Sequence, residues 1–395
     1  MALEFALIAR IKAAAQPFGQ DALQLFHNWM GIFALLLLLA HPILLIIFRY
    51  SANCWLYPFA SCGNQAMVTT SLSLYALILL IGLSIFHERL RIKYEFWQVT
   101  YGLLALFVLI VSLVHIFILG RFTTTPLMQT MWMVYAVIVT FLILWYKILK
   151  PILSWNQGWE VVENRRERGD THTLVLRPVG RDGFSFEPGQ YAWIKKGCTP
   201  FGVRQHPISL SSVGDVEPGG AISFTIKNLE NWSGKVVPNI QPGEKMWGDG
   251  PYGVLSADRE QGMGYVLIAG GLGIAPLYSM CHTLGECGDV RPVLLFFGAR
   301  NYDDLIFREE LEALKEKMNL QVIYVLSDPD EDWEGERGFI TAEILKRYFP
   351  KQYQKQYQRF VYFICGPEPL MNAMETILPE LGVPREKVFS ERFKM

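Results

Sequence analysis

Charged residues and metal-binding cysteine patterns are both scarce in this chain. Charged side chains make up only 18% of its 395 residues, and the net charge is −1. There is no basic arm, low-complexity tract or internal repeat, so nothing indicates nucleic-acid binding. The six cysteines include no CxxC pair and no Cys/His spacing of the kind that binds zinc. The sequence therefore predicts neither a nucleic-acid partner nor a zinc site.

Hydrophobic residues, by contrast, make up 51% of the chain, and their long runs are concentrated before residue 150. Four runs are long enough to be membrane spans, at residues 26–48, 67–86, 97–119 and 131–148. Basic residues gather in the loop 87–95, so the positive-inside rule places both termini in the cytoplasm. Cys54 and Cys62 would then lie on the outer face, as a disulfide or as two thiols. The first 20 residues predict an amphipathic surface segment rather than a signal peptide.

Histidines in the first and third runs indicate a redox centre. His27 and His41 are fourteen residues apart, so on a helix both point from one face, roughly 21 Å apart. They are either axial haem ligands or packing residues. The third run carries His115, which can pair with His41, but Tyr101 stands opposite His27. An inner haem would therefore need His87 or Tyr101 as its second ligand, or the inner site is empty.

Residues 155–260 predict an antiparallel β-barrel, because short alternating strands are broken by Pro/Gly turns. At one strand end, the segment Arg204-Gln205-His206-Pro207-Ile208-Ser209 offers a ring to cover an aromatic cofactor and a hydroxyl for a flavin nitrogen. Its arginine can bind a diphosphate. Ser233 and Gly234 are expected to open a helix whose N–H groups suit a phosphate. The turn cluster GDGPYG, residues 248–253, is as readily structural as functional.

From residue 261 onward, strands alternate with helices, which predicts a doubly wound parallel sheet. A glycine-rich turn follows the first strand directly and opens a helix. It contains Gly270, Gly271, Gly273 and Pro276. Glycines at this position let the backbone approach a pyrophosphate, and the helix dipole favours the pyrophosphate charge.

The same sheet edge holds further candidates. Arg300 ends the second strand, where an adenosine ribose would lie, and no acidic residue stands directly beside it in the sequence. NADPH is therefore favoured over NADH, although Asp303 and Asp304 nearby weaken that preference. Cys365-Gly366-Pro367 ends the last strand, where the thiol lies either by a nicotinamide or in the core. Near the terminus, Phe393 can stack on a flavin or serve as a packing anchor.

Taken together, these stretches resemble the ferric reductase and NADPH oxidase superfamily, in which a haem-bearing membrane domain is fused to a ferredoxin–NADP reductase-like module. FHNWMGIFALLLLLAH and KYEFWQVTYGLLALFVLIVSLVH are similar to its histidine helices, HPISLSS to its flavin motif, and GGLGIAPL and CGPEPLM to its nucleotide motifs. The resemblance implies that His41 and His115 hold an outer haem and that His27 serves an inner one. It implies flavin contacts from His206, Pro207 and Ser209, a diphosphate contact from Arg204, and catalytic roles for Ser209, Cys365 and Phe393.

The expected fold has three parts: a helical membrane bundle (1–154), an FAD-binding barrel (155–260) and an α/β NAD(P)-binding domain (261–395). The resemblance implies an enzyme of the bacterial inner membrane. Such an enzyme passes electrons from cytosolic NADPH through FAD and b-type haem to O2 or a ferric chelate outside. Two alternatives remain, an electron-donor subunit for a periplasmic redox protein and a haem-free membrane-anchored flavoreductase. The chain departs from the family in having four predicted spans rather than six, and in Tyr101.

Overall fold

The computed structural model forms two compact units, one from Ala22–Ile152 and one from the chain beyond Leu153. The described residues are 20–48, 65–87, 89–120, 123–155, 158–197, 199–201, 205–214, 217, 219–229, 232–260, 262–349, 351 and 356–391. Several predictions fall outside these ranges: Arg204, Phe393, the Cys54–Cys62 pair and the amphipathic first segment.

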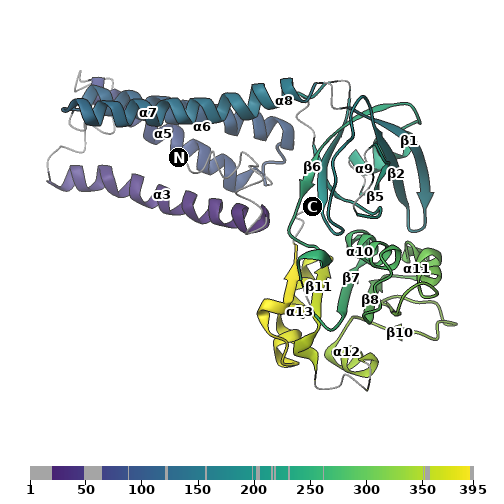
Figure 1. The fold of residues 1–395 in the computed structure, drawn as a ribbon. Coiled ribbons are helices and arrows are strands. Elements are labelled where there is room, and N and C mark those ends of the chain that lie inside the picture. Colours follow the sequence, from purple (N-terminus) through teal and green to yellow (C-terminus); the bar gives the residue numbers. More distant parts are fainter. Residues whose placement is uncertain are drawn as a thin grey trace. The chain divides into compact units, whose positions relative to one another are not determined.

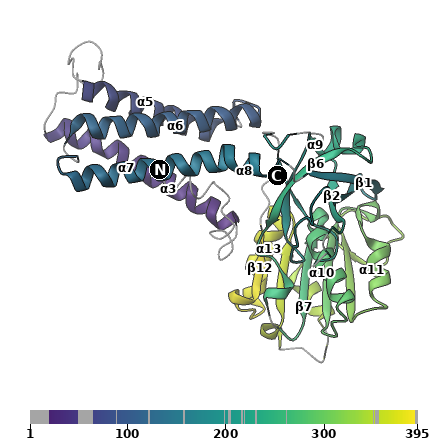
Figure 2. The same ribbon diagram turned by 45° about the horizontal axis from the view of Figure 1, so that its top comes forward.

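Four long helices make up the first unit, and each contains most or all of one predicted apolar run (Figure 1, Figure 2). They are α3 (Gln20–Phe48), α5 (Gln65–Phe86), α6 (Tyr94–Leu119) and α7 (Pro126–Leu144). After α7 the chain continues through a π-helical turn, Trp145–Leu149, into α8 (Lys150–Leu153). Local signals set the start of α7, because the Thr125 hydroxyl accepts the Met128 N–H and Pro126 takes the first helical position.

The helices of this unit contact one another and leave many large apolar side chains exposed. Ser73 of α5 and Ser112 of α6 share a hydrogen bond of 2.9 Å. Leu35 of α3 packs against the small apolar cluster between α5 and α6. Outward-facing side chains such as Trp29 and Val137 are 65% and 67% exposed. Such large exposed apolar areas are typical of helices that hydrocarbon covers.

Among the residues that the structure describes, two segments are long and apolar enough to cross a membrane, Phe96–Ile118 and Pro126–Leu153. The apolar stretches found in the described parts of α3 and α5 are shorter, Leu25–His41 and Ser71–Phe86. The four predicted helices are therefore confirmed, whereas four membrane crossings stay a prediction.

The second unit begins with a six-stranded antiparallel sheet in the order β4-β3-β6-β1-β2-β5. Its strands are β1 (Gly158–Glu167), β2 (Thr171–Pro178), β3 (Tyr191–Lys196), β4 (His206–Ser209), β5 (Ile222–Lys227) and β6 (Lys245–Tyr252). A bridge between Leu210 and Phe224 brings the two outer strands together. The sheet therefore curls into the predicted barrel around a core that includes Trp159, Leu174 and Phe224.

A parallel sheet follows, in the order β10-β9-β8-β7-β11-β12. Its strands are β7 (Tyr265–Gly270), β8 (Val293–Ala299), β9 (Leu320–Leu326), β10 (Glu336–Arg337), β11 (Val361–Cys365) and β12 (Val388–Ser390). Its main helices are α10 (Ile274–Glu286), α11 (Arg308–Leu314), α12 (Ala342–Tyr348) and α13 (Glu368–Glu380). The first two pack into the apolar core on one face and the last two into the core on the other (Figure 1). The doubly wound prediction is confirmed, and the strand order reverses between β7 and β11.

Helix α10 joins the barrel to the parallel sheet within this second unit. The Ser279 hydroxyl donates to the Ser212 carbonyl at 2.6 Å. The Gly214 N–H donates to the Thr283 hydroxyl at 2.8 Å. These buried polar contacts fix the barrel beside the switch point of the sheet, where doubly wound proteins bind their ligands.

Candidate functional site

The predicted flavin motif forms β4, which pairs with β3 in the barrel. The register sets Tyr191 opposite Ser209 and Trp193 opposite Pro207. The His206 ring stacks on Trp232, with 4.0 Å between ring centroids and 13° between planes. The imidazole is therefore held in a fixed plane, as a ring that covers a flavin must be.

The predicted phosphate turn is a single helical turn, α9 (Trp232–Lys235), which begins one residue before Ser233. The Ser233 hydroxyl accepts the Leu229 N–H at 3.0 Å. A Cβ on Gly234 would stand 1.9 Å from Asn228 Oδ1, so a larger residue there would require the Asn228 side chain to move. Gly234 thus has a packing role here, and phosphate binding by this turn stays a prediction.

The glycine-rich turn lies at the switch point, between β7 and α10, and its glycines differ in surroundings. Gly271 has a φ of +52°, and a Cβ there would meet no heavy atom within 4 Å. A Cβ on Gly273 would stand 2.1 Å from the Cys365 carbonyl oxygen. A Cβ on Gly270 would stand 2.8 Å from Pro367 Cδ. Pro276 is buried in the first helical turn. Gly271 therefore leaves room for a pyrophosphate above α10, whereas Gly270 and Gly273 allow close packing against β11 and the turn that follows it.

Cys365 ends β11 beside this turn and is only 2% exposed. Burial, and after it the carboxylate of Glu391, raise the pKa of the Cys365 thiol to about 12. Gly366 comes next, and a Cβ on it would stand 3.0 Å from the Gly270 nitrogen. Pro367 precedes α13 as its N-cap residue. At physiological pH the site therefore presents a neutral thiol rather than a thiolate.

This burial predicts a selective pattern of alkylation. At pH 8, iodoacetamide should modify the exposed Cys287 while Cys281 and Cys365, both buried, resist. A thiol with a pKa near 12 has on the order of 1000-fold less thiolate than an ordinary one at this pH. Peptide mapping by mass spectrometry measures each site, and unfolding in urea should make all three react alike. Labelling of Cys365 as fast as Cys287 in the folded protein would contradict the burial.

Glu391 is a candidate that the sequence analysis missed. It follows β12 and is 3% exposed. A Cβ on Gly253, at the end of β6, would stand 2.9 Å from Glu391 Oε2 and 3.2 Å from the Tyr191 ring. Tyr191 pairs with Ser209, and the Glu391 carboxylate acts on the pKa of Cys365, so two of the three predicted catalytic residues each have a neighbour at this contact. In the sequence, the one sign of this role was that Glu391 is an acidic residue directly after the last strand.

Arg300 follows β8 as predicted, but an acidic residue lies beside it. Its Nε and Nη2 are each 3.3 Å from Asp328 Oδ2, which follows β9. Asp304 pairs with Lys227 at 2.8 Å, and Asp303 is exposed. The NADPH preference assumed that no acid stands at Arg300, and this assumption is wrong.

The predicted haem ligands lie on two continuous helices. His27 and His41 are both in α3, and Tyr101 and His115 are both in α6. Each pair is thus separated by roughly 21 Å along its helix. His41 is exposed, while His27 and His115 are partly buried.

His115 has an oxygen partner on the neighbouring helix. Its Nδ1 lies 3.1 Å from the hydroxyl of Thr69 in α5. A histidine that binds iron through Nε2 donates its Nδ1–H to such an oxygen, which fixes tautomer and ring orientation. This donor set fits an axial haem ligand.

At the other end of α6, aromatic rings gather around Tyr101. The His87 ring stacks on Trp97 with 4.6 Å between centroids, and Trp97 lies 5.4 Å from Tyr101. His87 Nδ1 is 2.9 Å from the Ser84 carbonyl oxygen. His87 Nδ1 therefore faces a carbonyl oxygen, where His115 Nδ1 faces a hydroxyl, and the His87 ring contacts the same Trp97 that lies beside Tyr101.

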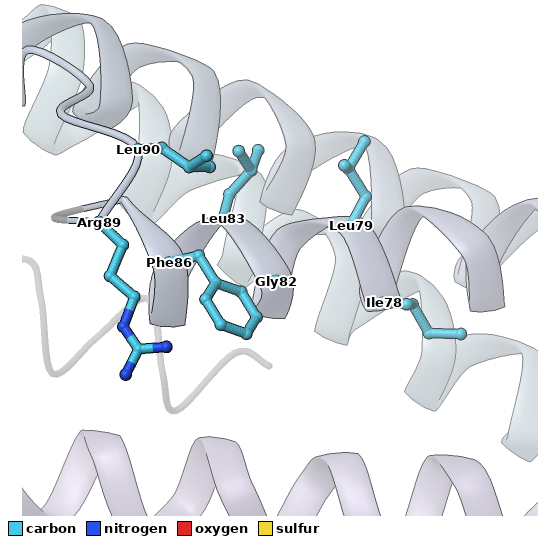
Figure 3. Close-up of a pocket in the computed structure, with 7 residues that line it drawn as sticks. All are labelled: Ile78, Leu79, Gly82, Leu83, Phe86, Arg89 and Leu90. Carbon is cyan, nitrogen blue, oxygen red and sulfur yellow. The ribbon is translucent and has the colours of Figure 1, made fainter.

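A further groove of about 480 Å³ runs along α5, with Arg89 at one end (Figure 3). Its lining residues are Ile78, Leu79, Gly82, Leu83, Phe86, Arg89 and Leu90. Apart from Arg89 the lining is apolar, and it offers no side chain that ligates iron, so the groove has no place in the candidate site.

Two families match separate parts of the chain. The ferric reductase like transmembrane component matches residues 1–112, and the oxidoreductase NAD-binding domain matches residues 267–376. The chain is 34% identical over 230 residues to the xylene/toluene monooxygenase electron transfer component XylA of Pseudomonas putida, covering 56% of this chain and 62% of that protein. It is 30% identical over 242 residues to NADH-cytochrome b5 reductase 2 of Scheffersomyces stipitis, covering 56% of this chain and 78% of that one.

Solved structures share the fold of the second unit. The ferredoxin reductase in carbazole 1,9a-dioxygenase matches with a TM-score of 0.51 at 24% identity, covering 60% of this chain and 69% of that one. The flavohem-like FAD/NAD-binding domain of nitric oxide dioxygenase from Vibrio cholerae matches with a TM-score of 0.52 at 20% identity, covering 60% and 98%. The protein is an NAD(P)H-dependent oxidoreductase with an FAD-binding barrel and an NAD(P)-binding domain. The chain belongs to the ferric reductase and NADPH oxidase superfamily, in which a ferric reductase-like transmembrane component is fused to a ferredoxin–NADP reductase-like module.

Proposed function

We propose that this protein carries electrons from cytosolic NAD(P)H across a membrane to an acceptor on the outer face. The observation that carries this proposal is the contact between His115 and Thr69, since it gives an apolar helix an oriented iron ligand. The same chain supplies a reductase module in which Gly271 leaves room for a nucleotide pyrophosphate.

The proposed domains are 1–154 in the membrane, 155–260 for FAD and 261–395 for NAD(P). Basic residues in the loop 87–95 favour a topology with both termini in the cytoplasm, and the bacterial inner membrane is the proposed location. On this topology NAD(P)H reaches the reductase module from the cytosolic side.

FAD supplies the conversion of hydride chemistry into one-electron steps, and b-type haem supplies electron transfer through the membrane. His206, held flat on Trp232, would cover the flavin ring, and the Ser209 hydroxyl would bond a flavin nitrogen. Arg204 and the turn at Ser233 would hold the diphosphate. Cys365 would pack as a neutral thiol by the nicotinamide, and Phe393 would stack on the flavin.

His41 and His115 form the proposed outer haem site. For an inner site, His27 needs a partner from the end of the bundle that carries Tyr101. The Ser84 carbonyl oxygen at His87 Nδ1 favours His87 over Tyr101, because it leaves Nε2 for iron.

A second candidate function is electron donation to a partner protein rather than to a small molecule. XylA is named as an electron transfer component, and the Scheffersomyces relative as a cytochrome b5 reductase. Both names describe delivery to another protein. A periplasmic redox protein would then replace O2 or a ferric chelate as the acceptor.

The first test is the haem-to-FAD ratio of the purified full chain, from a reduced pyridine–haem spectrum against released flavin. A ratio near two indicates that His27 is also a ligand, and a ratio near one leaves His41 and His115 as the single pair. A ratio near zero contradicts the transmembrane function and leaves a membrane-anchored flavoreductase.

The acceptor is tested with the same preparation in sealed vesicles. NAD(P)H added on the reductase side should reduce a ferric chelate, or O2 to superoxide, on the opposite side. Full haem reduction with neither product would favour the donor role.

A further inference from the structure

Arg300 and Asp328 stand together at the carboxyl edge of the parallel sheet. Arg300 follows β8 and Asp328 follows β9, and the pairing of these strands continues past their ends. The Ser327 N–H donates to the Ala299 carbonyl at 3.0 Å, and the Asp328 N–H donates to the Arg300 carbonyl at 2.7 Å. The backbone therefore fixes the two side chains as neighbours.

The two side chains form an ion pair that a ligand can reach. Arg300 Nη2 lies 3.3 Å from Asp328 Oδ2, and the side chains are 73% and 69% exposed. In doubly wound sheets this edge receives the adenosine ribose, where an acidic residue accepts from a 2′-hydroxyl and an arginine accommodates a 2′-phosphate. Here the arginine charge is already balanced by a carboxylate.

Other cations near this edge are engaged as well. Arg337 donates to the backbone carbonyls of Asp330, Glu331 and Trp333. Lys227 pairs with Asp304 at 2.8 Å. The segment after β9 contains six acidic residues: Asp328, Asp330, Glu331, Asp332, Glu334 and Glu336. Of these six, Asp328 is the residue that pairs with Arg300.

We propose that Asp328 makes the protein select NADH over NADPH. This inference rests on the proposed nucleotide-binding function of the glycine turn. The Asp328 carboxylate accepts a hydrogen bond from the ribose 2′-hydroxyl of NADH, and it repels the dianionic 2′-phosphate of NADPH. The sequence alone does not show that Asp328 lies beside Arg300, because Asp328 is 28 positions further along the chain.

The test compares NADH and NADPH as donors to ferricyanide, using the full chain loaded with FAD in detergent. The wild-type ratio of kcat/KM values should favour NADH by about 10- to 100-fold, as expected when like charges are brought together at a ligand site. Asp328→Asn should raise kcat/KM for NADPH by about tenfold or more, chiefly through KM. Binding of 2′,5′-ADP and 5′-AMP, measured by calorimetry, gives a readout independent of turnover.

Two further variants sharpen the result. Asp330→Asn removes the same charge from the same loop without touching Arg300, and it should leave the NADH-to-NADPH ratio nearly unchanged. In Asp328→Asn alone, the released Arg300 guanidinium is free to bind the 2′-phosphate. Adding Arg300→Ala removes that guanidinium and should cancel the part of the NADPH gain that it supplies. Equal use of both nucleotides by the wild type, or an unchanged ratio in Asp328→Asn, would overturn the proposal. Failure of both NADH and NADPH to bind would overturn the proposed function itself.

Discussion

Replacing His115 by leucine should remove the outer haem from the purified protein while its FAD content stays constant. An axial ligand is lost, and the Thr69 hydroxyl 3.1 Å from Nδ1 no longer orients anything. The haem-to-FAD ratio should fall by one, and acceptor reduction across a vesicle membrane should fall by about 100-fold or more, beyond the loss typical of an outer-shell partner. His41→Leu should give the same phenotype. Reduction of ferricyanide on the reductase side should persist in both variants.

A subtler variant separates ligation from packing. Thr69→Val keeps His115 but removes its oxygen partner, and it should weaken haem retention by about 10- to 100-fold. Ser73→Val is the matched control, because it removes another hydroxyl between α5 and α6, one that bonds Ser112 at 2.9 Å and no histidine. Equal haem loss in both variants would point to helix packing. Full transmembrane activity in His115→Leu would sink the ligand assignment.

The elements of this protein could be predicted because their signals are local. Apolar runs placed α3 and α6, and with them the spacing of His27, His41 and His115. The alternation of apolar strands with helices predicted the parallel sheet, and the glycine turn was placed at its switch point. Runs of apolar residues and a short glycine motif are enough to predict these features.

The parts that could not be predicted depend on contacts between distant segments. The pairing of β8 with β9 brings Asp328 to Arg300, and no local pattern contains that register. Glu391 lies near Cys365 because β12, which it follows, pairs with β11. It lies near the barrel because Gly253, directly after β6, packs against its carboxylate. Gly271 and Gly273 cannot be told apart in the sequence motif. In the structure, Gly273 packs against the end of β11, whereas Gly271 has open space around it.

The different surroundings of Gly273 and Gly271 predict different effects of an alanine substitution at each position. Gly273→Ala should destabilise the nucleotide domain by on the order of 3 kcal/mol, because its Cβ would lie 2.1 Å from the Cys365 carbonyl oxygen and 2.8 Å from the Gly366 nitrogen. Backbone atoms on both sides cannot move aside without disturbing β11. Thermal unfolding of the full chain should show the loss, and nucleotide-dependent reduction of FAD should fall with it.

Gly271→Ala, two residues away, should behave in the opposite way. Its Cβ meets no atom within 4 Å, so the cost is limited to about 1–2 kcal/mol for an L residue at a φ of +52°. The new methyl would stand where the pyrophosphate approaches the N-terminus of α10, so nucleotide affinity should drop by about tenfold or more even though the fold survives. A Kd titration with NADH beside the unfolding curve distinguishes the two variants. If Gly271→Ala bound NADH normally, the pyrophosphate would have to lie elsewhere, and the assignment of this turn would fail while the packing role of Gly273 stood.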